Sequence, residues 1–331
     1  MVCINILLGP DIARAAKCSA WLKAEMGVPS VPAGTGAIRF MKDPIQPYPI
    51  RASSQAVAEA KELQTLLLAH RYGHLRRVDV AHALWPNSAA RVAEKMAHRT
   101  VGRLSERGWI LEVFNILGGL SLMLAKTGAV QLRARGIYAR QGCDMSSITS
   151  PDFFHRMLCT CYLIRRQGQG HQSFGEHAIT MGQAPARCRE LQSRFHKLPD
   201  GIVVVPGAER GYEHATSAAD WIQAVSSRKP YEELKRIFDL ARKSGAWLDD
   251  AHTVILDRVV VLYDDRTDQG KSIKQALQRY VAAREPSDPS IHSSIWLARC
   301  NIRPPLTWCG CETVDAATLL YGGRSQTDMQ E

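Results

Sequence analysis

The chain is 331 residues long, with 45% hydrophobic residues, a formal net charge of +10 and a pI near 9.3. This length favours two domains, and the apolar fraction is high enough for real hydrophobic cores. The positive charge favours a polyanionic partner. No apolar run approaches the roughly 20 residues that cross a bilayer, which predicts a soluble, cytoplasmic protein with no membrane partner.

Cysteine usage argues against an extracellular disulfide framework. The nine cysteines are an odd number for a chain of this size, which favours a reducing cytosol. Cys159-x-Cys161 and Cys309-x-Cys311 have one intervening residue, whereas structural zinc sites usually place two to four residues between ligands. No P-loop, G-x-S-x-G or H-E-x-x-H motif is present. We therefore expect no zinc and no other cofactor.

The N-terminal stretch 1–50 is predicted to be an appendage followed by a linker. A helix is expected over Asp11–Met26, before a Pro- and Gly-rich segment in which Pro44, Pro47 and Pro49 favour extended backbone. We assign no chemistry to this stretch.

Residues 51–140 are predicted to form three helices, a hairpin and a closing helix. The expected elements are helices over Gln55–His70, Val78–Trp85 and from Asn87 to Gly108, strands over Trp109–Asn115 and Leu120–Leu124, and a helix over Lys126–Arg135. Ser53 or Ser54 is expected to cap the first helix, and Asn87 or Ser88 the third. Gly118 and Gly119 permit the hairpin turn. This outline predicts a winged helix-turn-helix domain.

The third helix carries two neighbouring stripes of side chains. Val92, Met96, Thr100 and Leu104 recur every four residues, and a line of cations recurs every four residues one position earlier. We expect the apolar stripe to pack inward beside the basic one, although an ordinary solvated face is the alternative. Residues 51–143 hold 14 Lys or Arg and 6 Asp or Glu, a net charge of +8. The candidate DNA-binding residues are Arg76, Arg77, Arg91, Lys95, Arg99, Arg103, Arg107 and Lys126.

Three stretches of this region resemble a known family. RVDVAHALWP, RLSERGWI and LAKTGAVQLRARGI are similar to the N-terminal winged helix of plasmid replication-relaxation proteins. The resemblance implies double-stranded DNA of a plasmid or other mobile element as the partner. It also implies that a PD-(D/E)XK nuclease-like domain follows.

The second half is predicted to be an α/β domain over residues 151–315, after a polar linker Gln141–Pro151 and before a tail 316–331. The expected elements are helices Asp152–Arg166, Tyr231–Ser244 and Lys271–Arg284, and strands Ile202–Val205, Ala219–Val225, Thr253–Tyr263, Ser293–Ala298 and Leu306–Cys309. The intervening stretch RRQGQGHQSFGEH is predicted to be a loop. His155 is expected to be a packed or capping residue rather than a catalyst.

The nuclease-like resemblance implies a specific set of metal ligands. An active member has one aspartate at the first strand of the hairpin and two polar residues spaced i, i+2 on one face of the next, which converge on a divalent metal. Asp200 fits the first position, but Gln223 and Val225 occupy the other two. One carboxylate and an amide hold a hard cation weakly.

We therefore expect neither catalytic residues nor a metal, with Asp200 only a weak metal candidate. If activity survives, Asp200, Gln223 and Lys229 would carry it with Mg²⁺. Glu176 would be a further ligand from the preceding segment, and Asp220 is expected on the opposite face of its strand.

The sequence thus predicts an α+β protein, with a winged helix-turn-helix domain followed by a PD-(D/E)XK nuclease-like domain that is degenerate. The predicted function is binding of double-stranded DNA in the replication, mobilisation or control of a mobile element. The alternatives are a metal-dependent DNA endonuclease and an adaptor that binds other proteins of the same element. A homodimer is an open alternative for its assembly.

Overall fold

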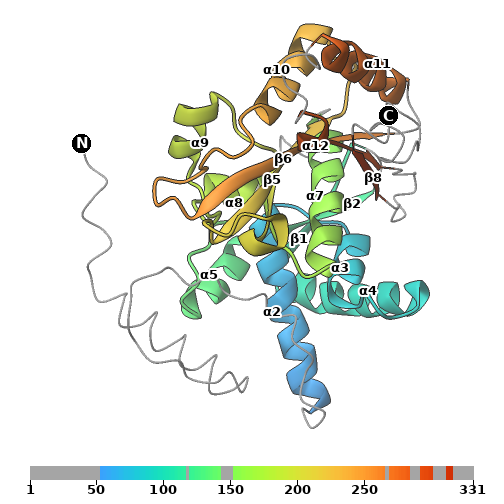
Figure 1. Cartoon of the computed structure of the whole chain (residues 1–331). Helices are drawn as coiled ribbons and strands as arrows, with labels where there is room; N and C mark the ends of the chain where they lie inside the picture. The colour runs from blue at the N-terminus through green and yellow to red at the C-terminus, as the bar shows by residue number, and fades with distance from the viewer. Residues whose placement is uncertain are drawn as a thin grey trace.

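The computed structural model describes residues 53–116, 119–142, 152–264, 268–283, 291–300 and 311–315. These residues form helices, a two-stranded sheet and a six-stranded mixed sheet (Figure 1), which confirms the α+β class. The expected appendage 1–50, most of the linker Gln141–Pro151, the strand Leu306–Cys309 and the tail 316–331 lie outside the described residues. Within the described ranges, no helix is long and apolar enough to cross a membrane.

The N-terminal part contains four helices and a hairpin in the predicted order. Its elements are α2 (Ser54–Tyr72), α3 (Arg77–Leu84), α4 (Ala90–Glu106), β1 (Ile110–Phe114), β2 (Leu120–Leu124) and α5 (Lys126–Ala134). Ser53 caps α2 as predicted, since its Oγ accepts a hydrogen bond from the Ala56 amide at 3.1 Å. The cap predicted for α4 is wrong, because Ala89 occupies that position and offers no side-chain bond.

The hairpin is closed by Asn115. Its amide donates to the Gly119 carbonyl at 2.8 Å, and its Oδ1 accepts from the Gly119 amide at 3.2 Å. Residues 117–118, which include half of the predicted Gly118-Gly119 turn, are outside the described ranges. β1 and β2 pair antiparallel from Ile110 opposite Leu124 to Phe114 opposite Leu120, so the predicted hairpin is present.

The buried side of α4 differs from the predicted one. It is formed by Ala93, Ala97, Thr100, Val101 and Leu104. Val92 and Met96, predicted to pack inward, are 53% and 39% exposed, so that prediction is wrong for both. A helix turns by about 100° per residue, so a strict four-residue repeat drifts by about 40° at each step. The stripe therefore begins in solvent and enters the core only at Thr100.

The large sheet has the strand order β3-β4-β5-β6-β7-β8. Its strands are β3 (Gln172–Gly175), β4 (Gly201–Pro206), β5 (Ser217–Val225), β6 (Val254–Asp264), β7 (Ile295–Cys300) and β8 (Cys311–Asp315). β6 pairs in parallel with β5 and β7, and the remaining neighbours pair antiparallel. β3 falls in the stretch predicted to be a loop, so that prediction is wrong: a strand of four residues that ends in Gly175 is too short to show a strand pattern.

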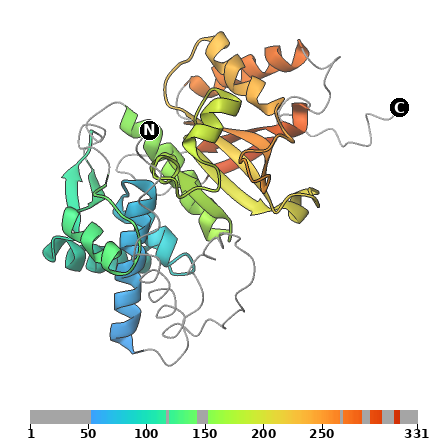
Figure 2. The same cartoon turned by 90° about the vertical axis from the view of Figure 1, so that its left-hand side faces the viewer.

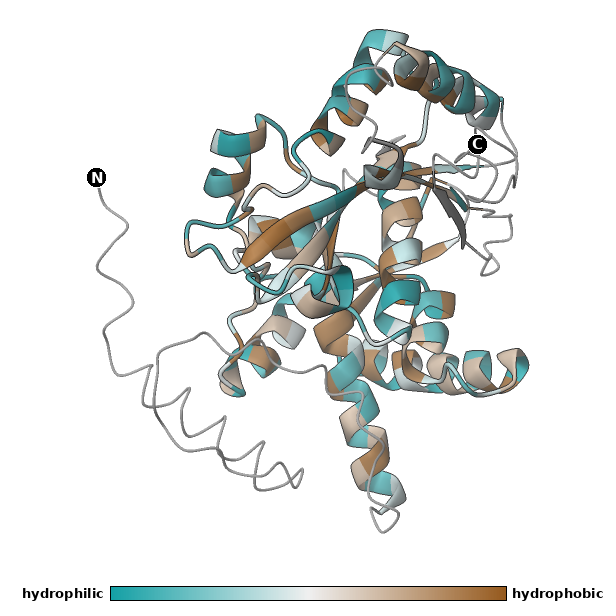
Figure 3. Cartoon of the chain, viewed as in Figure 1, coloured by the Kyte–Doolittle hydropathy of each residue, from teal (hydrophilic) through white to brown (hydrophobic). Residues whose placement is uncertain are grey.

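Helices cover both faces of this sheet. They are α7 (Asp152–Gly168), α8 (Glu176–Thr180), α9 (Cys188–Phe195), α10 (Tyr231–Ala241), α11 (Gln269–Ala282) and the short α12 (Ile291–Ser294), with a 3₁₀ turn η1 at Gly207–Arg210. α10 and α11 are the crossovers that join the parallel strands. Figure 3 shows hydrophobic residues along the strands, whereas the helices alternate hydrophobic and hydrophilic residues around their circumference.

One buried cluster joins the two halves of the chain. Leu104 of α4 and Leu122 of β2 belong to the same cluster as Leu163 of α7 and Ile222 of β5. Figure 2 shows α7 between the N-terminal helices and the sheet. A second cluster on the other sheet face includes Trp221. The strand alternation therefore places Ile222 and Trp221 on opposite faces of the sheet.

Candidate nucleic-acid interface

The solvent side of α4 begins with three cations that are not used inside the protein. Arg91, Lys95 and Arg99 are exposed and make no hydrogen bond or ion pair with any residue of the described ranges. They occupy successive turns, so they span about 12 Å of the helix axis at 1.5 Å per residue. Such side chains keep their full hydrogen-bonding capacity for an external anion.

The last two cations of the same line are engaged by one buried carboxylate. Arg103 Nε lies 2.6 Å from Glu62 Oε1, and Arg107 Nη1 lies 2.6 Å from Glu62 Oε2. The Glu62 side chain is only 6% exposed. Arg107 also lies over the Trp109 ring at 5.2 Å. The 40° drift per step brings these two arginines round to α2, so they are not equivalent to Arg91.

Arg76, predicted to contact phosphate, is buried. Its side chain is 3% exposed, and its Nε and Nη2 donate to Asp79 at 2.9 and 2.6 Å. Nη2 also donates to Cys161 Sγ at 3.1 Å, so the Cys159-x-Cys161 pair contributes to packing. A guanidinium in this position cannot reach DNA without unfolding α3, which removes Arg76 from the candidate contacts.

Arg77 and Lys126 differ in the interactions that their side chains make within the protein. Arg77 forms an ion pair with Glu112 of β1 and a 2.8 Å hydrogen bond with His98 Nδ1. Its role is therefore to tie α3 to β1 and α4. Lys126, the first residue of α5, is exposed and has no ion pair within the described ranges. Lys126 thus remains available as an additional phosphate contact.

Apolar side chains are exposed beside these cations. Val92 and Met96 lie on the solvent side of α4, and Phe114 and Ile116 at the end of β1 are 72% and 50% exposed. A helical period of 3.6 residues per turn, used in place of four, predicts from the sequence that Val92 and Met96 are exposed. On α4, the exposed apolar residues Val92 and Met96 therefore directly follow the exposed cations Arg91 and Lys95 in the chain.

Asp200 and Gln223, two of the predicted nuclease-like residues, lie together where the start of β4 meets the end of β5. Asp200 Oδ2 accepts hydrogen bonds from Gln223 Nε2 and, at 2.7 Å, from the Ala224 amide. Gln223 is 5% exposed, and Val225 is 1% exposed within the apolar cluster. Gly201 pairs with Ile222 in the β4–β5 hairpin, which is why the first strand and the end of the second meet here.

His155 of α7 completes this cluster. Its Nε2 lies 3.0 Å from Asp200 Oδ2, so it is a partner of the aspartate and not merely a packed residue. Two N–H donors and the His155 ring nitrogen therefore surround Asp200 Oδ2, whereas Mg²⁺ prefers oxygen-rich surroundings. In the described ranges, no group of three His, Cys, Asp or Glu side chains could hold a metal ion.

The side chains of the other two candidates, Lys229 and Glu176, form ion pairs with residues other than Asp200. Lys229 forms an ion pair with Glu233 on the first turn of α10. Glu176 lies 3.5 Å from Arg156, and its amide donates to the Asp200 carbonyl. Lys197, which the sequence did not single out, is close enough that Asp200 partly offsets the lowering of its pKa by burial. Asp200, Lys229 and Glu176 therefore each have a partner at this end of the sheet. Gln223 Oε1, in contrast, is buried and has no hydrogen-bond partner in the described residues.

Comparison of the chain with protein-family models, curated proteins and solved structures finds no match. The functional argument therefore depends on the two arrangements described above. The solvent side of α4 offers unpaired cations, whereas the carboxylate of Asp200 is already surrounded by donors.

Proposed function

We propose that this protein binds double-stranded DNA of a plasmid or other mobile element through α4 and the β1–β2 hairpin, which act as a winged helix. In this proposal α4 enters the major groove and the hairpin contacts the adjacent backbone. The single observation that carries it is the row of unpaired cations Arg91, Lys95 and Arg99 on the solvent side of α4.

The spacing of these cations supports the major groove as their target. The groove is about 12 Å wide and admits one helix, and the row places one cation on each of three successive turns of α4. Val92 and Met96 lie in the same solvent-exposed turns and would contact thymine methyl groups. Arg91 and Lys95 are proposed to reach base edges, and Arg99 and Lys126 to hold phosphates.

We propose that the second half is a PD-(D/E)XK-like fold whose cleavage chemistry has been lost. The support is chemical: Gln223 donates its amide N–H to Asp200 where an active site would place a second acid on the metal. The buried Gln223 amide and the Ala224 N–H stabilise the carboxylate without a cation.

A DNA titration tests the proposal. Lys95→Ala combined with Arg99→Ala should reduce affinity and lower the magnitude of the slope of log K against log salt by about 0.9, because Arg99 is the proposed phosphate contact of the pair and each phosphate contact contributes about 0.9. The matched control is Arg189→Ala with Arg236→Ala, two exposed cations of α9 and α10, which removes the same charge far from α4. Equal salt slopes for the two double variants would contradict the role of α4.

A metal-dependent endonuclease is the second candidate, since the hairpin does bring Asp200 and Gln223 together. Plasmid DNA incubated with the protein and Mn²⁺ or Mg²⁺ separates the two proposals. We expect no nicking. Nicking that disappears in Asp200→Ala would overturn the view that this site is degenerate.

A further inference from the structure

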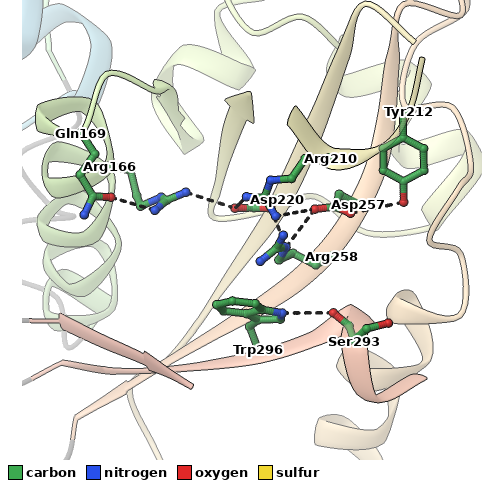
Figure 4. Close-up of polar contacts among 9 residues, drawn as sticks. All are labelled: Arg166, Gln169, Arg210, Tyr212, Asp220, Asp257, Arg258, Ser293 and Trp296. Carbon is green, nitrogen blue, oxygen red and sulfur yellow. Dashed lines mark hydrogen bonds and ion pairs between the residues drawn. The ribbon is translucent and has the colours of Figure 1, made fainter. Parts of the chain in front are cut away.

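Three arginines from three separate elements converge on the face of the sheet beside α7 (Figure 4). Arg166 comes from α7, Arg210 from η1 and Arg258 from β6, and we call them with Asp220 and Asp257 the arginine cluster. The arginines are 15 to 19% exposed, so each keeps an edge at the surface, whereas Asp220 is 3% exposed.

A β-bulge builds this cluster. Ala219 pairs with Leu256 and Asp220 with Arg258, so Asp257 is an extra residue in β6. The bulge turns Asp257 and Arg258 toward the same group: Arg258 Nε lies 2.9 Å from Asp257 Oδ2 and 3.2 Å from Asp220 Oδ1. Bulges between parallel strands are rare, and they recur where a side chain must be re-aimed near a functional site.

The arginines are not saturated by the two acids. Arg258 uses only Nε, and its terminal nitrogens make no hydrogen bond within the described ranges. Its Cζ atom lies over the Trp296 ring, 4.2 Å from the ring centroid. Arg166 Nη2 is 3.8 Å from Asp220 Oδ2, beyond hydrogen-bond length, and Arg166 Nε is buried without a partner. The cluster therefore retains hydrogen-bond donors and, with both aspartates ionised, a formal net charge of +1.

The surrounding groups also favour an anion. Trp296 is held by a 3.1 Å bond from Nε1 to the Ser293 carbonyl, which fixes the ring on which Arg258 stacks. Packing on an aromatic ring orients the planar guanidinium group of Arg258 for bidentate hydrogen bonding to phosphate. Burial and the two arginines Arg166 and Arg210 lower the pKa of nearby His171, so it adds no positive charge to the site near pH 7.

We propose that the arginine cluster binds a single phosphate group, held by the terminal nitrogens of Arg258 and by Arg166, with Arg210 contributing charge. The phosphate competes with the Asp220 carboxylate for the positive charge of the three arginines. The site is separate from α4 and does not depend on its role in DNA binding. The phosphate would belong to a free nucleotide or to the end of a DNA strand.

Calorimetric titration of the full chain with inorganic phosphate tests this site. Wild-type protein should bind phosphate, and Arg258→Gln and Arg166→Gln should each weaken binding by about tenfold. At pH 8, where Asp220 is ionised, Asp220→Asn should strengthen binding by about tenfold, because it removes a negative charge close to the phosphate. A gain of affinity cannot arise from misfolding, so this variant keeps the test valid if an arginine variant fails to fold.

Two further titrations identify the source of the phosphate. If the source is a DNA end, a 5′-phosphorylated oligonucleotide binds more tightly than its 5′-hydroxyl form, and Arg258→Gln removes the difference. If it is a free nucleotide, AMP competes with inorganic phosphate and the oligonucleotides bind alike. Absence of phosphate binding in the wild type, or binding unchanged in Arg258→Gln and Asp220→Asn, overturns the proposal. Lys95→Ala with Arg99→Ala should leave phosphate binding unchanged, which separates this outcome from failure of the DNA-binding proposal.

Discussion

The solvent side of α4 and the arginine cluster both contain several cations, but the two sets differ in exposure and in ion pairing. On α4, Arg91, Lys95 and Arg99 lie in solvent without an acidic partner in the described ranges. In the cluster, Arg210 and Arg258 are shielded and share Asp220 and Asp257. An exposed cation contributes to DNA binding at little cost in stability, whereas a shielded one must be compensated inside the fold.

Net charge alone therefore does not locate function in this chain. Arg76, Arg103 and Arg107 belong to the basic region 51–143, yet each is bound by an acid that is nearly buried. The difference predicts two classes of variant. Removing an acid from a shielded arginine should affect stability, and removing an unpaired cation should affect DNA affinity.

The largest expected effect is on the Arg76–Asp79 pair. Asp79→Ala leaves a buried guanidinium without its carboxylate and should lower the free energy of unfolding by about 3–5 kcal/mol. Urea denaturation followed by circular dichroism measures this loss. A loss below about 1 kcal/mol, comparable to that of an exposed pair, would mean that Arg76 has access to solvent and would return it to the candidate DNA contacts.

A pH-dependent effect is expected at Asp220. Burial raises its pKa to about 7, against the lowering by Arg210 and Arg166 and with Asp257 adding to the rise. The folded protein therefore binds a proton that the unfolded chain has lost, and stability should fall as pH rises from about 4 to 7. The associated change is on the order of 4 kcal/mol at most.

Asp220→Asn provides the matching measurement. The amide cannot ionise, so this variant should be more stable relative to wild type at pH 8 than at pH 5 in urea denaturation. An equal difference at both pH values would show that Asp220 is ionised throughout, as expected if Arg166, Arg210 and Arg258 outweigh burial.

The elements of the N-terminal half could be predicted because strong breakers separate them. Gly73 and Gly108 have positive φ values of 77° and 66°, and Pro86 lies between α3 and α4, so helix ends were confined to a few positions. The orientation of α4 was predicted less well. A repeat of four residues was treated as one face, although the helix drifts away from it, and the unpaired cations were therefore not distinguished from the paired ones.

The Asp200–Gln223 group could be predicted from the sequence, whereas the arginine cluster could not. Asp200 and Gln223 were predicted to meet because a hairpin joins their strands, which fixes their register locally. The arginine cluster was missed because Arg166, Arg210 and Arg258 come from three distant elements and form no motif. The bulge at Asp257 has no sequence signature either, since one extra residue is invisible until the neighbouring strand is in place.

A smaller effect is expected where the Asp200 cluster is given a second acid. Gln223→Glu places two carboxylates together and should lower stability in EDTA by about 1–3 kcal/mol, since an amide–carboxylate hydrogen bond is lost as well. Mn²⁺ should restore part of the loss, as ligand binding to the folded state stabilises it. Wild-type melting that rises equally with Mn²⁺ would show that the existing residues already hold the metal.

The smallest expected effect is that of removing a single unpaired cation. Arg91→Ala should leave the free energy of unfolding within about 0.5 kcal/mol of wild type, because the side chain makes no contact that folding must preserve. Its DNA affinity should fall, most strongly at low salt, and if Arg91 contacts a phosphate the salt slope should decrease by about 0.9. If Arg91 instead reads a base, the slope stays the same and discrimination between DNA sequences is reduced. Reduced stability with unchanged DNA binding would mean that Arg91 stabilises the fold and does not contact DNA. The contrast between exposed and shielded cations would then be wrong for the first turns of α4.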